Sequence, residues 1–126
     1  MQNMRPFALT GLITAYITLL VTSQIMYKFA GLWSLSHPGP GLLGTAFKNP
    51  WIAMGLGSAM IAMLLWLMIL RQLSLTEAYP WTALIYIITP IASTIIFGEL
   101  LKPQYFLGLA LVIVGVFIAT RPLRGQ

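Results

Sequence analysis

Two polar side chains near the end of the first apolar stretch, Gln24 and Lys28, are the strongest candidates for chemistry in this sequence. Their four-residue spacing places them on one face of a helix, with Tyr27 beside them. Because a charge at the centre of a membrane helix costs roughly 2.5 to 3.5 kcal/mol, a lysine there is a candidate functional group. An ammonium supplies charge and an amide supplies a directed donor, which together suit a phosphate. The alternative is that Lys28 ends the span and extends its ammonium to the lipid headgroups.

Two acidic residues are present in the sequence, and each has a structural and a functional interpretation. The segment from Ser74 to Glu77 has the capping-box pattern, in which the serine and the glutamate satisfy each other's exposed amides at a helix start. The same Glu77 carboxylate is suited to exchange a proton or to pair with a cationic headgroup. Glu99 lies in a short turn three residues before Lys102. We expect Glu99 to form either an interfacial ion pair, which contributes little to stability, or a contact with a substrate.

One face of the third apolar stretch carries tyrosines and a serine. Tyr79, Tyr86 and Ser93 follow one another at spacings of seven residues, on the same stripe as Pro90 and Phe97. Such groups either line a wet groove or form hydrogen bonds with another span, and the pattern leaves both interpretations open.

Small residues form smooth strips on two other apolar stretches. Gly108 and Gly115 are seven residues apart in the last stretch, and Gly55 and Ala59 are four residues apart in the second. Because small side chains let another backbone approach closely, both strips predict contacts between helices. The spacing does not indicate which helix is the partner.

The sequence offers little for catalysis or for binding a metal. Its single histidine, His37, lies in a Pro/Gly segment with no second ligand or base nearby. Cysteine is absent, which excludes disulfides, a thiolate nucleophile and any Cys-ligated zinc or iron–sulfur site. We therefore expect a protein that is not an enzyme and that needs no metal or cofactor.

The composition indicates a membrane protein. Of 126 residues, 59% are apolar and 7% are charged, whereas soluble domains carry roughly 25% charged residues. The formal net charge of +5 would suggest nucleic acid in a soluble protein. Here the basic residues lie mostly at the edges of loops, where we expect them to contact lipid headgroups. The expected partner is therefore the membrane lipid and not nucleic acid.

Four apolar stretches predict an all-α membrane protein with four transmembrane helices in an up-down bundle. The predicted spans form one domain over residues 1–126 and cover residues 7–29, 50–70, 75–98 and 103–120. Between the first two spans, a Pro/Gly segment predicts a loop from Ala30 to Asn49, with an interfacial turn over residues 42–47. Asn49 followed by Pro50 predicts the start of the second span. Pro90 predicts a kink in the third span, where a neighbouring helix must satisfy the freed backbone group.

The basic residues differ slightly between the two ends of this bundle. Four spans place both termini on one side of the membrane. That side holds four arginines and the other side holds three lysines, namely Arg5, Arg71, Arg121 and Arg124 against Lys28, Lys48 and Lys102. The positive-inside rule then favours cytoplasmic termini by a small margin, and insertion in both orientations stays open. No internal repeat is visible, so two inverted halves would have to come from two chains.

Several motifs, taken in order, resemble a known family. They are Gln24-x-x-x-Lys28, the Glu77-Ala78-Tyr79-Pro80 segment, Gly98-Glu99, and Gly108-x-x-Leu111-x-x-x-Gly115-Val116. The chain is similar to the small four-helix, EamA-like members of the drug/metabolite transporter superfamily, and most of all to the aminoarabinose-phosphoundecaprenol flippase subunits. The small multidrug resistance exporters are a more distant likeness.

The resemblance implies a transporter that flips a polyprenyl-phosphate-linked monosaccharide across the cell inner membrane as a homo- or heterodimer. It suggests Lys28 for the phosphate, Glu77 or Glu99 for the sugar side, and Gly108 with Gly115 for dimer contact. The expected substrate-binding residues are those singled out above: Gln24, Lys28, Glu77, Tyr79, Tyr86 and Glu99.

Two alternative functions stay open. One is proton-coupled export of organic cations, as in small multidrug resistance exporters, with Glu77 or Glu99 as the carboxylate. Those exporters use a glutamate in the middle of the first span, whereas residues 8–23 contain no acid here. The other alternative is an accessory membrane subunit that does not transport and packs against a partner through its glycine strips.

Overall fold

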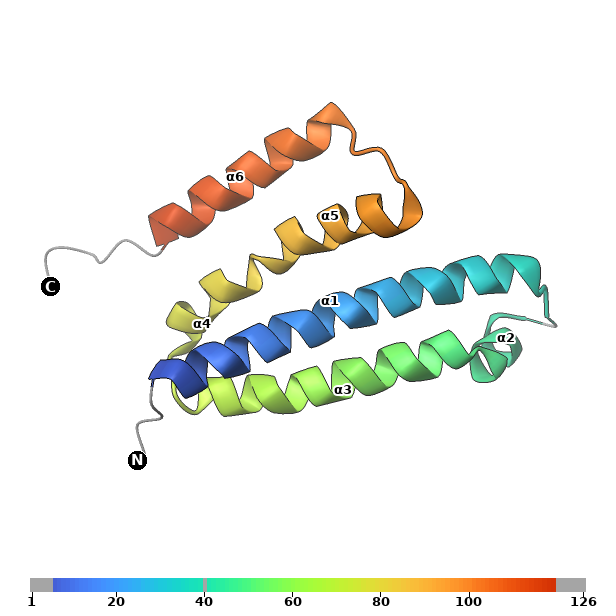
Figure 1. Ribbon diagram of the computed structural model, residues 1–126, viewed down its shortest axis with the longest axis horizontal. Helices are drawn as coiled ribbons and strands as arrows, with labels where there is room; N and C mark the ends of the chain where they lie inside the picture. Colours follow the sequence, from blue (N-terminus) through green and yellow to red (C-terminus); the bar gives the residue numbers. More distant parts are fainter. Residues whose placement is uncertain (1–5, 40, 120–126) are drawn as a thin grey trace, which may run out of the picture.

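The described part of the chain is helical and contains no strand. The computed structural model describes residues 6–39 and 41–119. These residues form six helices: α1 (Pro6–Ser36), α2 (Leu42–Lys48), α3 (Pro50–Leu70), α4 (Leu75–Thr82), α5 (Ile85–Phe97) and α6 (Pro103–Ala119). Figure 1 shows α1 and α3 as a long antiparallel pair, α4 and α5 following one another along α1, and α6 returning beyond α5. The predicted all-α class is confirmed.

Three helical segments are long and apolar enough to cross a membrane. They are α1, α3 and the segment Leu75–Phe97, which contains α4 and α5. The apolar helix α6 has 17 residues and is shorter than these three. At 1.5 Å per residue α6 is about 26 Å long, near the lower limit for a spanning helix. Multi-pass membrane insertion follows from these lengths.

Helix α1 is longer than the sequence predicts. The first predicted span ends at residue 29, whereas α1 continues to Ser36, seven residues later. Gly31 does not end the helix, since an isolated glycine costs only about 1 kcal/mol relative to alanine. The helix ends before His37 because the following Pro38 disfavours helical backbone at the residue that precedes it. The expected loop from Ala30 was therefore placed too early.

A buried asparagine, Asn49, connects the loop to α1 by a hydrogen bond and caps the N-terminus of α3. The Asn49 side chain accepts a hydrogen bond from the Trp51 amide at 3.0 Å and donates one to the Ala30 carbonyl at 2.9 Å. Its side chain is buried. The predicted start of this helix at Asn49 and Pro50 is confirmed. Preceding it, the turn expected at residues 42–47 is the short helix α2.

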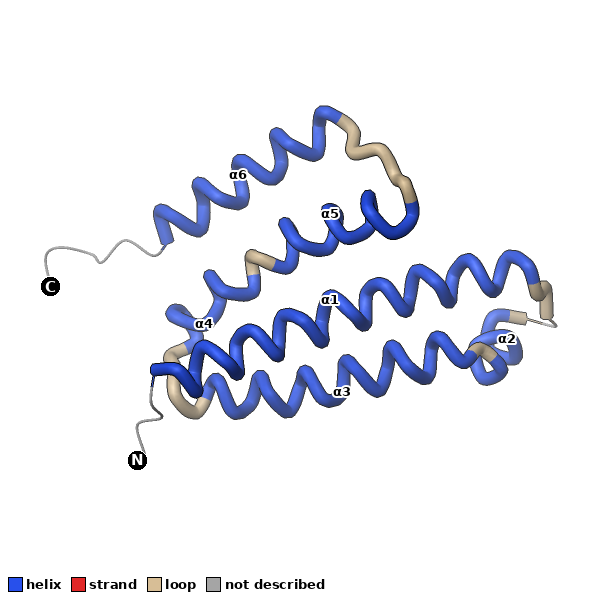
Figure 2. The backbone as a smooth tube through the Cα atoms, viewed as in Figure 1, coloured by secondary structure: helices blue, strands red, loops and turns tan. Residues whose placement is uncertain are grey.

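The third predicted span is interrupted, but not at the expected proline. The interruption lies at Ala83 and Leu84, between α4 and α5, and Pro90 lies inside α5 (Figure 2). A proline has no N–H to donate to the carbonyl four residues earlier, here that of Tyr86. The Tyr105 hydroxyl of α6 donates a hydrogen bond to this carbonyl. A neighbouring helix thus satisfies the freed group as predicted. The interruption at residues 83 and 84 was not predicted, and the expected kink at Pro90 stays a prediction.

The core is a seam between α1 and α3, reached also by α4. Apolar residues of α1, including Ile13, Ile17 and Val21, are buried together with Ala62 and Ile69 of α3. A Cβ atom on Gly55 of α3 would lie 2.7 Å from the Tyr27 ring, so a larger residue would force this ring to move. The predicted role of the Gly55 strip in helix packing is confirmed within the chain.

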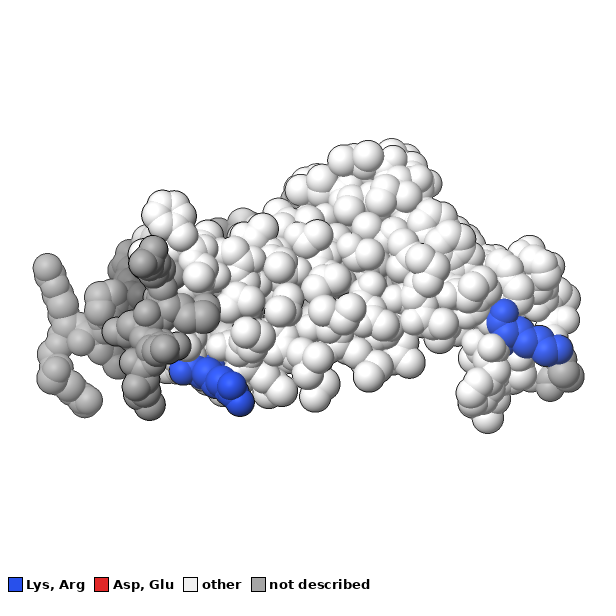
Figure 3. All heavy atoms as spheres, turned by 60° about the horizontal axis from the view of Figure 1, so that its bottom comes forward, with Lys and Arg blue, Asp and Glu red and all other residues white. Residues whose placement is uncertain are grey.

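Outward-facing surfaces are apolar, and charges gather at the ends. Large apolar side chains on α3 and α6 are exposed, among them Met60, Met63, Leu64, Leu107 and Leu111. Figure 3 shows basic side chains near the two ends of the molecule, with an uncharged surface between them on this face. This distribution matches a bilayer, in which the apolar belt contacts lipid tails and the charged ends contact headgroups.

Candidate functional site

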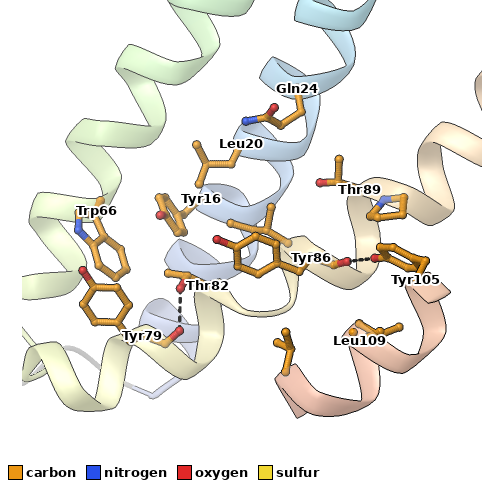
Figure 4. A pocket seen from close by; sticks show the side chains of 14 residues that line it. Tyr16, Leu20, Gln24, Trp66, Tyr79, Thr82, Tyr86, Thr89, Tyr105 and Leu109 are labelled. Carbon is orange, nitrogen blue, oxygen red and sulfur yellow. Dashed lines mark hydrogen bonds between the residues drawn. The ribbon is translucent and has the colours of Figure 1, made fainter. Parts of the chain in front are cut away.

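A cavity of about 670 Å³ lies among five helices: α1, α3, α4, α5 and α6. Figure 4 shows it from close by. None of the described residues that line it is charged. They are Tyr16, Leu20, Gln24, Trp66, Tyr79, Thr82, Ile85, Tyr86, Thr89, Pro90, Tyr105, Gly108, Leu109 and Val112. Tyr86 lines this cavity and yet is 66% exposed, so the cavity is open to its surroundings.

Three aromatic rings form one end of the cavity. Tyr16 of α1 stacks on Trp66 of α3 with ring centroids 5.0 Å apart and planes 23° apart. Tyr79 of α4 meets Trp66 edge-on at 6.1 Å and 76°. Both arrangements are favourable for rings whose faces are negative and whose edges are positive. The three rings therefore form a fixed wall where α1, α3 and α4 meet.

Polar groups that can bind a ligand lie toward the other end. Gln24 of α1 and Thr89 of α5 line the cavity there, as does Tyr105 of α6. The Tyr105 hydroxyl already donates a hydrogen bond to the Tyr86 carbonyl. The Thr89 hydroxyl is buried and has no hydrogen-bond partner among the described residues. The cavity can therefore offer hydrogen bonds but no ionic contact.

Lys28 lies outside this lining and pairs with an acid from a distant segment. Its ammonium forms an ion pair with the Glu99 carboxylate, in the connection between α5 and α6. The Ser93 hydroxyl donates to the other oxygen of Glu99 at 2.5 Å. The ammonium also lies 5.8 Å from the centre of the Phe97 ring, within reach of a cation–π interaction. The ion pair expected between Glu99 and Lys102 is replaced by one that joins α1 to the connection between α5 and α6.

The aromatic rings around Lys28 indicate its depth in the membrane. The neighbouring Phe29 stacks on Trp51, in the first turn of α3, at 5.0 Å. It also contacts Phe97, the last residue of α5, at 4.9 Å. Lys28 is therefore level with the ends of two spans and not with their middle. Since its side chain is 43% exposed, the ammonium can reach both Glu99 and a lipid headgroup.

The Lys28–Glu99 pair also affects the titration of the acid. The hydrogen bond from Lys28, and after it the one from Ser93, lowers the pKa of Glu99 below its usual value. The carboxylate is therefore charged at neutral pH and holds the lysine in place. Because both side chains are almost half exposed, a soluble or lipid anion can reach the lysine without unfolding the protein.

Glu77 has the structural role that the sequence predicts. Its carboxylate accepts hydrogen bonds from the Ser74 amide at 3.1 Å and from the Ser74 hydroxyl at 2.9 Å. The Ser74 hydroxyl in turn accepts from the Glu77 amide, which completes the capping box. The carboxylate does not line the cavity described above. The capping box is confirmed, and a contact between Glu77 and a substrate stays a prediction.

Several similar proteins carry one name. The chain is 32% identical over 94 residues to the probable 4-amino-4-deoxy-L-arabinose-phosphoundecaprenol flippase subunit ArnE of Pseudomonas savastanoi pv. phaseolicola, covering 75% of this chain and 81% of that protein. It is 33% identical over 96 residues to the same subunit of Pseudomonas syringae pv. syringae, covering 75% and 83%. The chain belongs to the ArnE family of flippase subunits. The family predicted from the motifs is thereby confirmed.

A more limited match comes from Yersinia pseudotuberculosis. Its probable ArnE subunit is 34% identical over 68 residues, which cover 54% of this chain and 60% of that protein. No family model and no solved structure matches the chain. Membership of the ArnE family therefore rests on the sequence matches.

The predicted site residues of this ArnE-family chain fall into three separate places. Gln24, Tyr79 and Tyr86 line the cavity. Lys28 and Glu99 form the ion pair at the end of the bundle, and Glu77 caps α4. The stripe predicted on the third span is divided in the same way, since Pro90 lines the cavity and Ser93 contacts Glu99.

Sequence reasoning missed most of the lining residues, and four of them have aromatic rings or hydroxyl groups that are described above. They are Tyr16, Trp66, Thr89 and Tyr105. A signal existed for Tyr16, which precedes Gln24 by eight residues and therefore shares its helix face. No local pattern identifies the other three, because their role depends on how α3, α5 and α6 are arranged around α1.

The glycines of α6 face open space within the chain. A Cβ atom added to Gly108 or to Gly115 would meet no atom within 4 Å, leaving out the helix's own neighbouring backbone. Gly108 also lines the cavity. The predicted dimer contact through these residues stays a prediction.

Proposed function

We propose that this chain is a subunit of a transporter that flips a polyprenyl-phosphate-linked monosaccharide across the inner membrane. The carrying observation is a neutral, hydrogen-bonding cavity that ends one helical turn from a half-exposed ammonium. The substrate resembles aminoarabinose-phosphoundecaprenol, since the matched ArnE relatives are named for it. The isoprenoid tail stays in the lipid, so this small chain has to shelter only the sugar and the phosphate.

The two polar parts of the substrate meet different parts of the site. Lys28 binds the phosphate, because an ammonium is a compact charge with three donors. Glu99 competes with the phosphate for these donors and keeps Lys28 oriented when no substrate is bound. The sugar enters the cavity, whose proposed binding residues are Gln24, Tyr79 and Tyr86. A contact of the substrate with Glu99, which pairs with Lys28, or with Glu77, at the start of α4, is a separate prediction for a position of the sugar outside the cavity.

A second subunit completes the transporter. Helix α6 has no buried residue within the described chain, and Gly108 and Gly115 leave its surface smooth. We infer that α6 is a fourth span and that it contacts a second copy of the chain or a related subunit. The termini are proposed to lie in the cytoplasm on the side of Arg71. The other three arginines of that prediction, Arg5, Arg121 and Arg124, lie outside the described residues.

Replacing Lys28 by Met tests this function. The variant removes the charge and keeps most of the aliphatic stem, so translocation of the lipid-linked sugar in vesicles should fall at least tenfold. Lys48→Met is the matched control, because Lys48 ends α2 and does not contact Glu99 or the cavity. Both variants should retain the oligomeric state of the native protein. Unchanged flipping by Lys28→Met would contradict the role of Lys28 as the phosphate ligand.

Proton-coupled export of organic cations is less well supported. Such a mechanism needs a carboxylate that meets the cation and releases a proton. Neither Glu77 nor Glu99 lines the cavity, and each already accepts hydrogen bonds from serine. Proton-driven uptake of a fluorescent cation into inverted vesicles would nevertheless favour that function over lipid flipping.

A further inference from the structure

The charge of the cavity restricts which part of a ligand enters it. None of its described lining residues carries a charge, and the ammonium of Lys28 lies beyond it. Burying an isolated phosphate in such surroundings is costly, because its charge would have no partner. Burying a ring that bears hydroxyl groups costs far less free energy, since its hydrogen bonds to water are replaced by hydrogen bonds to the amide and hydroxyl groups of the wall. The chemistry of the cavity thus matches the hydroxyl groups of a monosaccharide ring. A protonated amino group on that ring would stay at the open side of the cavity, where Tyr86 is exposed.

One hydroxyl in this wall is without a partner. Most helical threonines in the described chain donate to a backbone carbonyl three or four residues earlier, among them Thr82 and Thr94. Thr89 does not, although its oxygen is buried. The carbonyl three residues before it belongs to Tyr86, which already accepts the Tyr105 hydroxyl. A buried hydroxyl without a partner is unfavourable because its lost hydrogen bonds to water are not replaced, so a ligand that bonds to it is favoured.

The orientation of Thr89 places this hydroxyl on the ligand side. Figure 4 shows it pointing from α5 toward α1, the helix that carries Gln24. Gln24 lines the same cavity, and its amide can both donate and accept. Its side chain is exposed and forms no hydrogen bond to the described residues that the structure records. Gln24 is therefore directly available to a ligand, and the buried Thr89 hydroxyl becomes available when a small movement of α5 or of its side chain exposes it to the cavity that Thr89 lines.

The distance along α1 matches a sugar joined to a phosphate. Gln24 and Lys28 are four residues apart on one helix face, which corresponds to about 6 Å along the axis. A phosphate bonded through one oxygen to a sugar ring lies directly beside that ring. A sugar level with Gln24 therefore leaves its phosphate level with Lys28, at the end of the bundle.

We propose that Thr89, together with Gln24, forms a subsite for the hydroxyl groups of a monosaccharide ring, one helical turn from the phosphate ligand Lys28. This inference rests on the proposed function and goes beyond it, because it separates recognition of the sugar from recognition of the phosphate. Thr89 then discriminates a lipid that carries a sugar from one that does not.

The test compares two lipids that differ only by the sugar. Binding of undecaprenyl phosphate, with and without 4-amino-4-deoxy-L-arabinose, is measured for the full chain in nanodiscs by native mass spectrometry, together with a partner subunit if it co-purifies. Thr89→Val keeps the shape and removes the hydroxyl, so it should weaken binding of the sugar-bearing lipid about fivefold to tenfold. Binding of undecaprenyl phosphate should not change. Thr89→Ser, which keeps the hydroxyl, should restore binding of the sugar-bearing lipid.

The control is Thr94, which lies five residues farther along the same helix. The Thr94 hydroxyl donates to the Pro90 carbonyl, and Thr94 does not line the cavity. Thr94→Val should therefore change neither affinity. The thermal stability of the unliganded protein gives a second readout, because removal of an unpaired buried hydroxyl should leave it unchanged or raise it.

Each result bears on one of the two proposals. An equal loss of both affinities in Thr89→Val, no loss of either, or a fall in unliganded stability would overturn the sugar subsite. The proposed role of Lys28 as the phosphate ligand would not be affected by these results, because Lys28→Met tests it separately. If the native protein binds neither lipid, the proposed function itself is contradicted and the subsite with it. If Lys28→Met weakens both lipids while Thr89→Val weakens only the sugar-bearing lipid, both proposals are supported.

Discussion

At the scale of single residues, the Lys28–Glu99 pair shows how a functional group can be found in sequence while its environment is not. The type and position of Lys28 predicted a cation near the membrane. Its partner lies 71 residues farther along the chain, on the connection to α6. No spacing rule joins two such positions, because their contact depends on how the third span packs against α1.

The titration of Glu99 leads to a prediction for stability. Because its folded-state pKa is lowered by Lys28 and Ser93, the carboxylate stabilises the fold at neutral pH. This stabilisation should begin to fade near the usual glutamate pKa of about 4.3 and should be lost as the pH falls through the lowered value. Thermal unfolding measured from pH 7 to pH 3 should show that the native protein loses stability as the pH falls. The loss of stability over the same range should be smaller in Glu99→Gln. Identical pH profiles would contradict the ion pair.

At the scale of the helices, the sequence predicted ends better than interruptions. Asn49 with Pro50 and Ser74 with Glu77 were predicted correctly, because a cap depends on two or three adjacent residues. The end of α1 was placed too early, because the segment from Ala30 was interpreted as a loop although Pro38 is the local signal that ends the helix. The interruption at residues 83 and 84 was not predicted either. Prediction of the site is limited by its dependence on tertiary contacts, because residues from five helices meet in one cavity.

Tyr105 should stabilise the packing of α6 against α5. Tyr105→Phe removes the donor to the Tyr86 carbonyl, which Pro90 leaves without a helical partner. We expect the free energy of unfolding to fall by about 0.5 to 2 kcal/mol, the range for an interhelical hydrogen bond within a membrane. The measurement is reversible unfolding in mixed micelles.

The matched control for this variant is Tyr27→Phe. The Tyr27 ring packs on Gly55, and its hydroxyl has no recorded hydrogen bond to the described residues. Its removal should therefore leave stability nearly unchanged. Equal stabilities of Tyr105→Phe and the native protein would show that another group satisfies the Tyr86 carbonyl.

At the scale of the whole molecule, the single chain forms a packed half and an open half. Helices α1 and α3 bury a shared seam, whereas α5 and α6 have no buried residue within the described chain. Lipid can cover an apolar face, but it cannot supply hydrogen bonds to a cavity that opens there. If the cavity carries a sugar between leaflets as proposed, it therefore needs a second protein surface, and α6 is an exposed helix that lines it.

Gly115 provides the test of that surface. Gly115→Leu places a bulky side chain where the chain itself leaves open space, and Gly115 does not line the cavity. If α6 packs on a second subunit, dimerisation in detergent should weaken at least tenfold, because a leucine keeps the two backbones apart. Gly57→Leu on α3 is the control, since a Cβ there also meets open space. A loss of the dimer in both variants, or in neither, would place the subunit contact elsewhere.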